Sequence, residues 1–124
     1  MKGLKALVAV LVATGLLAVA VPAVASGKAY KHYVGCGLSR KAKPSHVCPR
    51  KAHKGAFFKS FKRDVHYTVC VRFPSGKSLC VHAQKAEKGV LYVNKITSTI
   101  PGKHRVSWFV KGKKVGTFYF RVKR

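Results

Sequence analysis

The feature that most constrains this sequence is a pair of alternating segments on either side of a short turn. Residues 65–73 alternate apolar and polar side chains, and residues 78–83 do so again, which is the period of a half-buried β-strand. Between them, Pro74 suits the first corner of a type I turn, and Gly76 suits the left-handed position that closes a three-residue hairpin loop. The sequence therefore predicts a β-hairpin.

The same turn predicts a register for the two strands. Pairing the residues on either side of the loop places Cys70 opposite Cys80, at a site where the Cα atoms lie ~4.5 Å apart, a separation that a disulfide accepts. Cys36 and Cys48 are the remaining cysteines, and disulfides are typical of small exported chains. We predict both bridges, although only Cys70–Cys80 follows from geometry.

The first residues have the pattern of an export signal. A cationic start and a long uncharged run are followed by small residues at Ala23 and Ala25. Residues 6–25 would also just span a bilayer of ~30 Å, but the small residues at their end favour cleavage over a retained anchor. We therefore predict that residues 1–25 are a signal peptide and that the mature, secreted (extracellular) protein begins at Ser26.

The charge balance is strongly basic. The chain has 26 Lys and Arg, two acids and a formal net charge of +24, which falls to +22 when Lys2 and Lys5 leave with the signal peptide. A charge of this size attracts polyanions at long range. Asp64 and Glu87 are the only acids and have basic neighbours in sequence, so paired-carboxylate catalysis is not supported. We predict no catalytic residues and no enzyme.

Composition divides the mature chain in two. Residues 26–55 are rich in Gly, Pro and Lys, which predicts an irregular basic arm tied by its two cysteines, with a short strand near Tyr33. Residues 56–124 form the predicted β domain, because short apolar runs alternate with Gly and Pro. One helical turn is expected over residues 83–88. The predicted fold class is therefore all-β, a sandwich or small barrel.

The end of the chain resembles a known kind of domain. Residues 102–108 and 116–122 look like the closing hairpin of immunoglobulin-like domains in exported bacterial proteins, including the periplasmic copper-carrier family. The resemblance implies an immunoglobulin-like sandwich. It does not bring that family's metal site, because residues 26–28 offer no ligand and the turn at 111–113 has no histidine. Such sandwiches host many roles, so no function is implied.

A second candidate metal site lies on the predicted hairpin. In its register His66, Cys70, Cys80 and His82 project from one face, and tetrahedral zinc accepts such a set. A disulfide would remove both thiolates, and an oxidising compartment favours that disulfide. We therefore predict no metal and no cofactor.

Aromatic residues offer two further alternatives. Trp108, Phe109, Phe118 and Phe120 are typical of a sandwich core, although the same residues can form a platform for stacked ligands. Residues 57–63 mix three phenylalanines with three cations. That segment fits a strand edge, or an exposed surface that meets lipid headgroups or nucleic-acid bases.

Charge and compartment together favour binding over catalysis. The leading hypothesis is a non-enzymatic domain that binds extracellular polyanions, such as cell-wall polymers, acidic glycans or nucleic acid. The alternatives are a membrane-active antimicrobial or toxin-like protein, with a membrane surface as its partner, and an inhibitor or adhesion module. The sequence leaves the oligomeric state open. The predicted polyanion-binding residues are Lys41, Lys43, Arg50, Lys51, Lys54, Lys59, Lys62 and Arg63.

Overall fold

The computed structural model describes residues 28–124, so the predicted signal peptide lies outside the described residues. This part of the chain contains no helix long and apolar enough to cross a membrane. It consists of eight strands: β1 (Tyr30–Gly35), β2 (Val47–Cys48), β3 (Lys54–Ser60), β4 (Val65–Arg72), β5 (Ser78–Ala86), β6 (Leu91–Ile96), β7 (Gly102–Val110) and β8 (Lys113–Val122).

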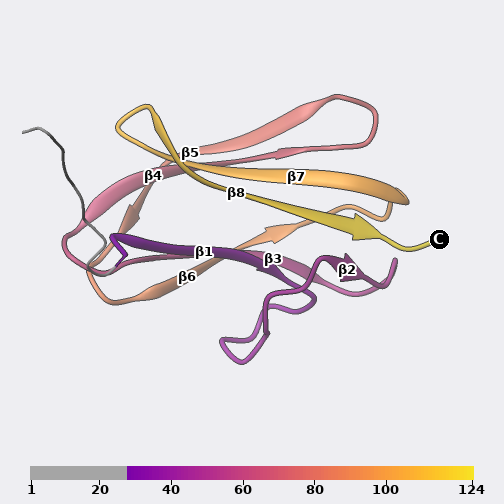
Figure 1. The fold of residues 1–124 in the computed structure, drawn as a ribbon, viewed down its shortest axis with the longest axis horizontal. Helices are drawn as coiled ribbons and strands as arrows, with labels where there is room; N and C mark the ends of the chain where they lie inside the picture. The colour runs from indigo at the N-terminus through magenta and orange to yellow at the C-terminus, as the bar shows by residue number, and fades with distance from the viewer. Residues whose placement is uncertain (1–27) are drawn as a thin grey trace, which may run out of the picture.

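The strands form two sheets that face each other (Figure 1). The three-stranded sheet has the order β1-β3-β6, and the five-stranded sheet has the order β2-β8-β7-β4-β5. All neighbours are antiparallel except β2 and β8, which are parallel. The all-β prediction is confirmed, with a sandwich as the architecture.

The core lies between the sheets. Trp108 is completely buried, so it belongs to the core and offers no ligand platform. Tyr67 of the five-stranded sheet stacks on Phe58 of the other sheet, with ring centroids 4.3 Å apart. On β8, Phe120 and Val122 are buried while Tyr119 and Arg121 are exposed, so side chains at the end of this strand alternate between the core and the outer face.

The hairpin predicted from its turn is confirmed in detail. Cys70 faces Cys80 and bonds to it, with Cα atoms 4.0 Å apart. The amide of Phe73 donates to the carbonyl of Lys77, and Gly76 adopts the left-handed conformation with φ 92°. A positive φ there costs glycine little, because it has no Cβ to clash.

One local prediction is wrong, because the helical turn expected over residues 83–88 is not formed. Strand β5 continues to Ala86. The change of register lies between Tyr67 and Val69, and Ala83 has φ 52°. Strand β5 thus carries a β-bulge, in which one extra residue lies opposite β4. The extra residue breaks the alternation of apolar and polar side chains from which a strand is predicted.

The predicted arm, residues 26–55, needs correction. It is not a separate irregular segment, because Tyr30–Gly35 is strand β1 and pairs with β3 along its whole length. Only residues 36–53 are mostly irregular, and within them β2 joins the five-stranded sheet. The arm's predicted disulfide, Cys36–Cys48, is present. The physical reason is that Tyr33 and Val34 are buried, which commits the first strand to the sandwich.

Residues 36–53, the arm segment from here on, cover the outer face of the three-stranded sheet. Tyr33 and Phe57 stack there with ring centroids 4.8 Å apart and are both buried, although neither faces the main core. Gly35 forms an isolated bridge to Pro44, and the amide of Ser45 donates to the carbonyl of Val34. The arm segment is therefore packed onto the sandwich.

Candidate anion-binding surface

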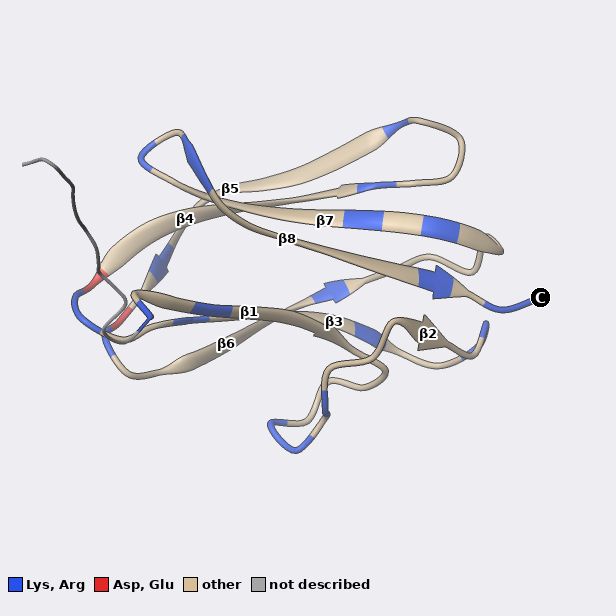
Figure 2. Cartoon of the chain, viewed as in Figure 1, with Lys and Arg blue, Asp and Glu red and all other residues tan. Residues whose placement is uncertain are grey.

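The predicted polyanion-binding residues do not form one surface. Lys41, Lys43, Arg50 and Lys51 are exposed on the arm segment. The loop that carries the first two projects away from the sandwich (Figure 2). Arg50 and Lys51 come just after β2. Strand β2 pairs with the last residues of β8, and the amide of Lys123 donates to the carbonyl of Cys48.

Lys54 is wrong as a binding residue, because its side chain is buried. Its ammonium donates to the carbonyl of Arg50 at 2.8 Å and to that of Ser98 at 2.7 Å. Burial lowers the pKa of the Lys54 ammonium, since the charged form loses its hydration. The same Ser98 pairs through its hydroxyl with Nε2 of buried His104 at 2.8 Å. Lys54 therefore ties the arm segment to the loop after β6.

The remaining three predicted residues lie elsewhere. Lys59 is half-buried, with its ammonium 5.2 Å from the centroid of the Phe61 ring. Lys62 and Arg63 are exposed in the loop before β4. Phe57 and Phe58 are buried, so the exposed aromatic surface considered for membrane contact is not formed there.

The structure instead assembles a basic row that the sequence reasoning missed. We call the outward side chains of Arg72, Lys103, Arg105 and Arg121 the basic stripe. They come from β4, β7 and β8 and share the outer face of the five-stranded sheet, since their strand neighbours Val71, His104, Phe120 and Val122 are buried on the opposite face.

Like charges face each other directly within the basic stripe. Arg72 is the cross-strand partner of Arg105, and Lys103 is the partner of Arg121. Side chains in such positions have Cβ atoms ~4.5–5.5 Å apart, and like charges there destabilise a sheet. Tyr119 lies beside the basic stripe, opposite Arg105, and is 46% exposed. The Lys103 ammonium is 4.8 Å from the centroid of its ring.

The stripe borders a shallow depression of about 230 Å³. Phe73 and Pro74 at the β4–β5 turn line it, together with Tyr119 and three stripe cations, Arg72, Lys103 and Arg105. Pro74 lies so close to Gly102 that a Cβ on this glycine would meet the proline Cγ at 3.1 Å. The turn is thus held against the start of β7, which fixes the shape of the depression.

The two acids are remote from the stripe. Asp64 and Glu87 flank the Val65–Ala86 end of the β4–β5 ladder, whereas Arg72 is at the other end. The eight residues of β4 separate these ends by roughly 23 Å. Figure 2 shows the same division, with the red segments at the end of the sandwich opposite the C terminus and blue segments on β7 and β8 near it. Within residues 28–124, neither acidic side chain lies beside the stripe.

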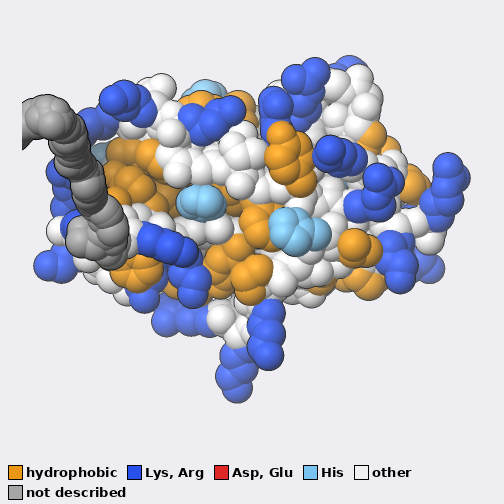
Figure 3. Space-filling view, in the orientation of Figure 1, with side chains coloured by type: hydrophobic (Ala, Val, Ile, Leu, Met, Phe, Trp, Pro, Cys, Tyr) orange, Lys and Arg blue, Asp and Glu red, His pale blue; other side chains and the backbone are white. Residues whose placement is uncertain are grey.

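The space-filling view shows the flank that carries β1, β2 and β8. Lys and Arg side chains lie at both ends of this flank, including the end near the C terminus, and further cations project from the arm segment (Figure 3). Arg50 and Lys51 are exposed just after β2, whose Val47 is the cross-strand partner of Arg121.

The candidate metal residues of the hairpin do lie together. His66, Cys70 and His82 line one shallow pocket on the outer face of the sheet. Both sulfurs are taken by the Cys70–Cys80 disulfide, and residues 28–124 contain no group of three or more His, Cys, Asp or Glu arranged to hold a metal ion.

Comparisons with known proteins bear on the fold. No protein-family model matches this chain, and no curated protein matches it. Among solved structures, it is similar to an immunoglobulin-like protein from Pseudomonas aeruginosa, over 79% of this chain and 94% of that one, with a TM-score of 0.53 and 14% sequence identity. The fold is therefore an immunoglobulin-like β-sandwich. Likeness at this identity concerns fold alone, and the copper-carrier resemblance stays a prediction.

Proposed function

We propose that the chain is a secreted, non-enzymatic immunoglobulin-like domain that binds extracellular polyanions through the basic stripe. Suitable ligands are cell-wall phosphate polymers, acidic glycans or nucleic acid. The proposal rests on one observation: cations lie opposite each other on neighbouring strands, Arg72 opposite Arg105 and Lys103 opposite Arg121. A bound anion would relieve this repulsion.

The chemistry of the stripe suits a linear polyanion. Three of its four cations are arginines, whose planar guanidinium groups bind phosphate and sulfate oxygens in pairs. Tyr119 adds an exposed aromatic face beside them, which supports stacking with a base or a sugar ring. The stripe crosses three strands, so successive charges of one chain would each meet a cation.

The test is a binding titration over a salt series, with short duplex DNA, polyphosphate and a sulfated glycosaminoglycan as probes. Ion release predicts a slope of log affinity against log salt of about −0.9 per neutralised DNA phosphate, and we expect roughly four to eight contacts for the parent protein. Contacts with phosphate position a ligand without reading its sequence, so DNA sequence preference should be slight.

Matched charge variants locate the surface. Neutralising Arg72, Lys103, Arg105 and Arg121 to Gln should flatten the DNA slope by roughly three to four. Neutralising Lys85, Lys88, Lys111 and Lys113 removes the same charge elsewhere and should change the slope much less. Equal slopes for the two variants would remove the stripe from the proposal, and salt-insensitive binding by the parent would remove polyanion binding itself.

A further inference from the structure

The flank of the sandwich formed by β5 and β6 is incomplete. Strand β6 is the edge of the three-stranded sheet on this side, and β5 is the edge of the five-stranded sheet. Leu79 and Val81 point inward, opposite the core residues Val71 and Val69, yet they are 63% and 46% exposed. No strand of residues 28–124 lies beneath them.

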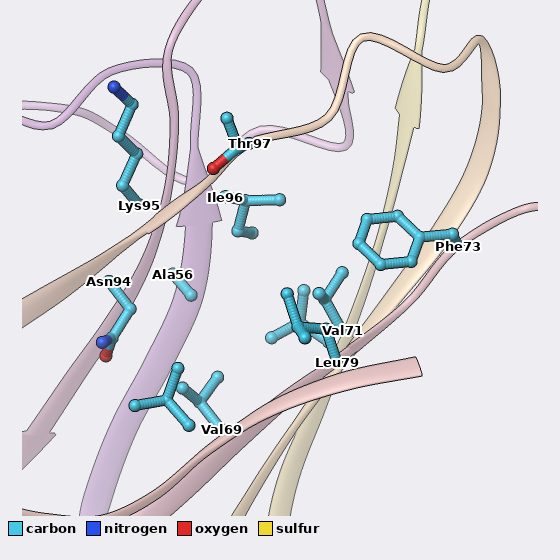
Figure 4. Close-up of a pocket in the computed structure, with 11 residues that line it drawn as sticks. Ala56, Val69, Val71, Phe73, Leu79, Asn94, Lys95, Ile96 and Thr97 are labelled. Carbon is cyan, nitrogen blue, oxygen red and sulfur yellow. The ribbon is translucent and has the colours of Figure 1, made fainter. Parts of the chain in front are cut away.

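The uncovered side chains line an apolar groove of about 110 Å³. Figure 4 shows Leu79, Val71 and Phe73 on one wall and Ala56 and Ile96 on the other, with the Lys95 amine pointing away from the groove.

One end of the groove is closed by polar side chains. Gln84 and Asn94 exchange two hydrogen bonds, of 3.1 and 2.7 Å, between β5 and β6. The Tyr67 hydroxyl also donates to the Asn94 oxygen at 2.8 Å, and burial raises the pKa of Tyr67 to about 12. The open part of the groove therefore runs from Asn94 to Thr97, roughly 13 Å of strand.

The dimensions of the groove fit an added strand. A chain that paired with the free edge of β6 would lie ~4.8 Å beyond it and ~10 Å from β5, directly beneath Leu79 and Val81. Among the strands of residues 28–124, β6 pairs with β3 alone and this ladder has no bulge, whereas β5 is interrupted at Ala83. Bulges protect an edge from pairing, so β6 is the better template.

We propose that this groove binds an extended segment of a partner protein, added as a strand to the edge of β6, with alternating apolar and acidic side chains. The apolar residues of the segment would cover Leu79 and Val81, as in other cases of strand addition. Its outward residues would lie beside Lys95, on a chain with a net charge of +24, so acidic side chains are favoured there. A second copy of this chain would bring like charge to the same edge.

The test uses the purified protein and synthetic peptides of about seven residues that alternate valine with glutamate. Amide NMR should show shifts over residues 93–97, and methyl NMR should show shifts at Leu79 and Val81. Both sets should persist at a salt concentration that abolishes binding to DNA. A strand hydrogen-bonds through one edge at a time. Of two peptides N-methylated on alternate residues, one should therefore bind and the other should not.

Variants separate the groove from the rest of the surface. Leu79→Ser should weaken peptide binding about tenfold or more, because the apolar contact is lost. Val47→Ser, a similarly exposed apolar residue on the opposite edge of the same sheet, should leave it unchanged.

Three results would overturn the inference. They are no peptide binding, equal binding of both N-methylated peptides, and a concentration-dependent dimer in sedimentation whose shifted amides are those of β6. The last would make a second copy the occupant. None of these outcomes bears on polyanion binding by the basic stripe, which the salt series tests separately.

Discussion

The two outer faces of this sandwich are built in opposite ways. The outer face of the three-stranded sheet carries Tyr33 and Phe57, which are buried beneath the arm segment. The outer face of the five-stranded sheet carries the basic stripe and Tyr119, and these residues have no such cover. Aromatic residues on the first face thus contribute to stability, whereas those on the second remain free to meet a ligand.

The largest expected effect separates the two aromatic positions. Phe57→Ala should lower the free energy of unfolding by about 3–5 kcal/mol, because a fully buried ring leaves a cavity. Tyr119→Ala should change it by less than about 0.5 kcal/mol, the usual range of surface substitutions, and should weaken polyanion binding. Urea denaturation and DNA titration of both variants measure these quantities. A large loss of stability in Tyr119→Ala would mean that the second face is structural too.

The two disulfides provide the next comparison. Each closes a short loop, with sequence separations of 12 for Cys36–Cys48 and 10 for Cys70–Cys80, so the loop-entropy model assigns about 3 kcal/mol to either. Replacing Cys36 and Cys48 together by Ala should cost more than replacing Cys70 and Cys80, because it also loosens the cover over Phe57. Thermal melting of the two double variants measures the difference. The reverse order would show that the cover holds without its bridge.

A smaller effect is expected from a glycine beneath the cover. A Cβ at Gly55 would lie 2.7 Å from Val93 Cγ2 and 2.9 Å from the Gly37 carbonyl oxygen. Gly55→Ala should therefore destabilise the protein by about 1–3 kcal/mol, the cost of overpacking. The control is Gly37→Ala, where the added Cβ would find only Ala42 at 3.7 Å. Equal melting temperatures for the two variants would mean that the arm segment can move to make room for the added Cβ at little cost in stability.

The smallest effect concerns histidines. Burial lowers the pKa of His104 and of His32 below the ordinary value of 6.5. Below pH 6.5 these histidines bind protons more readily in the unfolded chain than in the folded one. The free energy of unfolding is therefore highest above pH 6.5 and falls as the pH drops below it. The melting temperature of the parent should decrease from pH 7.5 to pH 5. His104→Gln should reduce this dependence, and the exposed His82→Gln should preserve it.

Local patterns in the sequence predicted the hairpin well. The loop at Pro74 and Gly76 determines which residues face each other, so the Cys70–Cys80 bridge followed from short-range geometry. The alternation of residues 65–73 and 78–83 was accessible for the same reason. Bulges were not: an extra residue at Ala83 extended β5 where a helical turn was expected.

The basic stripe could not be derived in the same way. Its residues lie far apart in sequence, and their adjacency depends on the pairing of β4 with β7, which no local signal reveals. The register of Lys103 with Arg121 also depends on a bulge beside Phe109, and a slip of one residue changes every cross-strand pair. Charge density along the sequence pointed instead to the arm, where Lys54 is buried.

The parallel pairing of β2 with β8 has a consequence for the order of assembly. Ribosomal synthesis proceeds from the N terminus, so the arm segment is made before the strand that receives it. The Nδ1–H of His46 donates to the Tyr119 carbonyl oxygen across a sequence separation of 73, whereas Cys36 and Cys48 are only 12 residues apart. Contacts distant in sequence form slowly. We therefore infer that the loop closed by Cys36 and Cys48 forms first. The arm segment then pairs with β8 after that strand has been made.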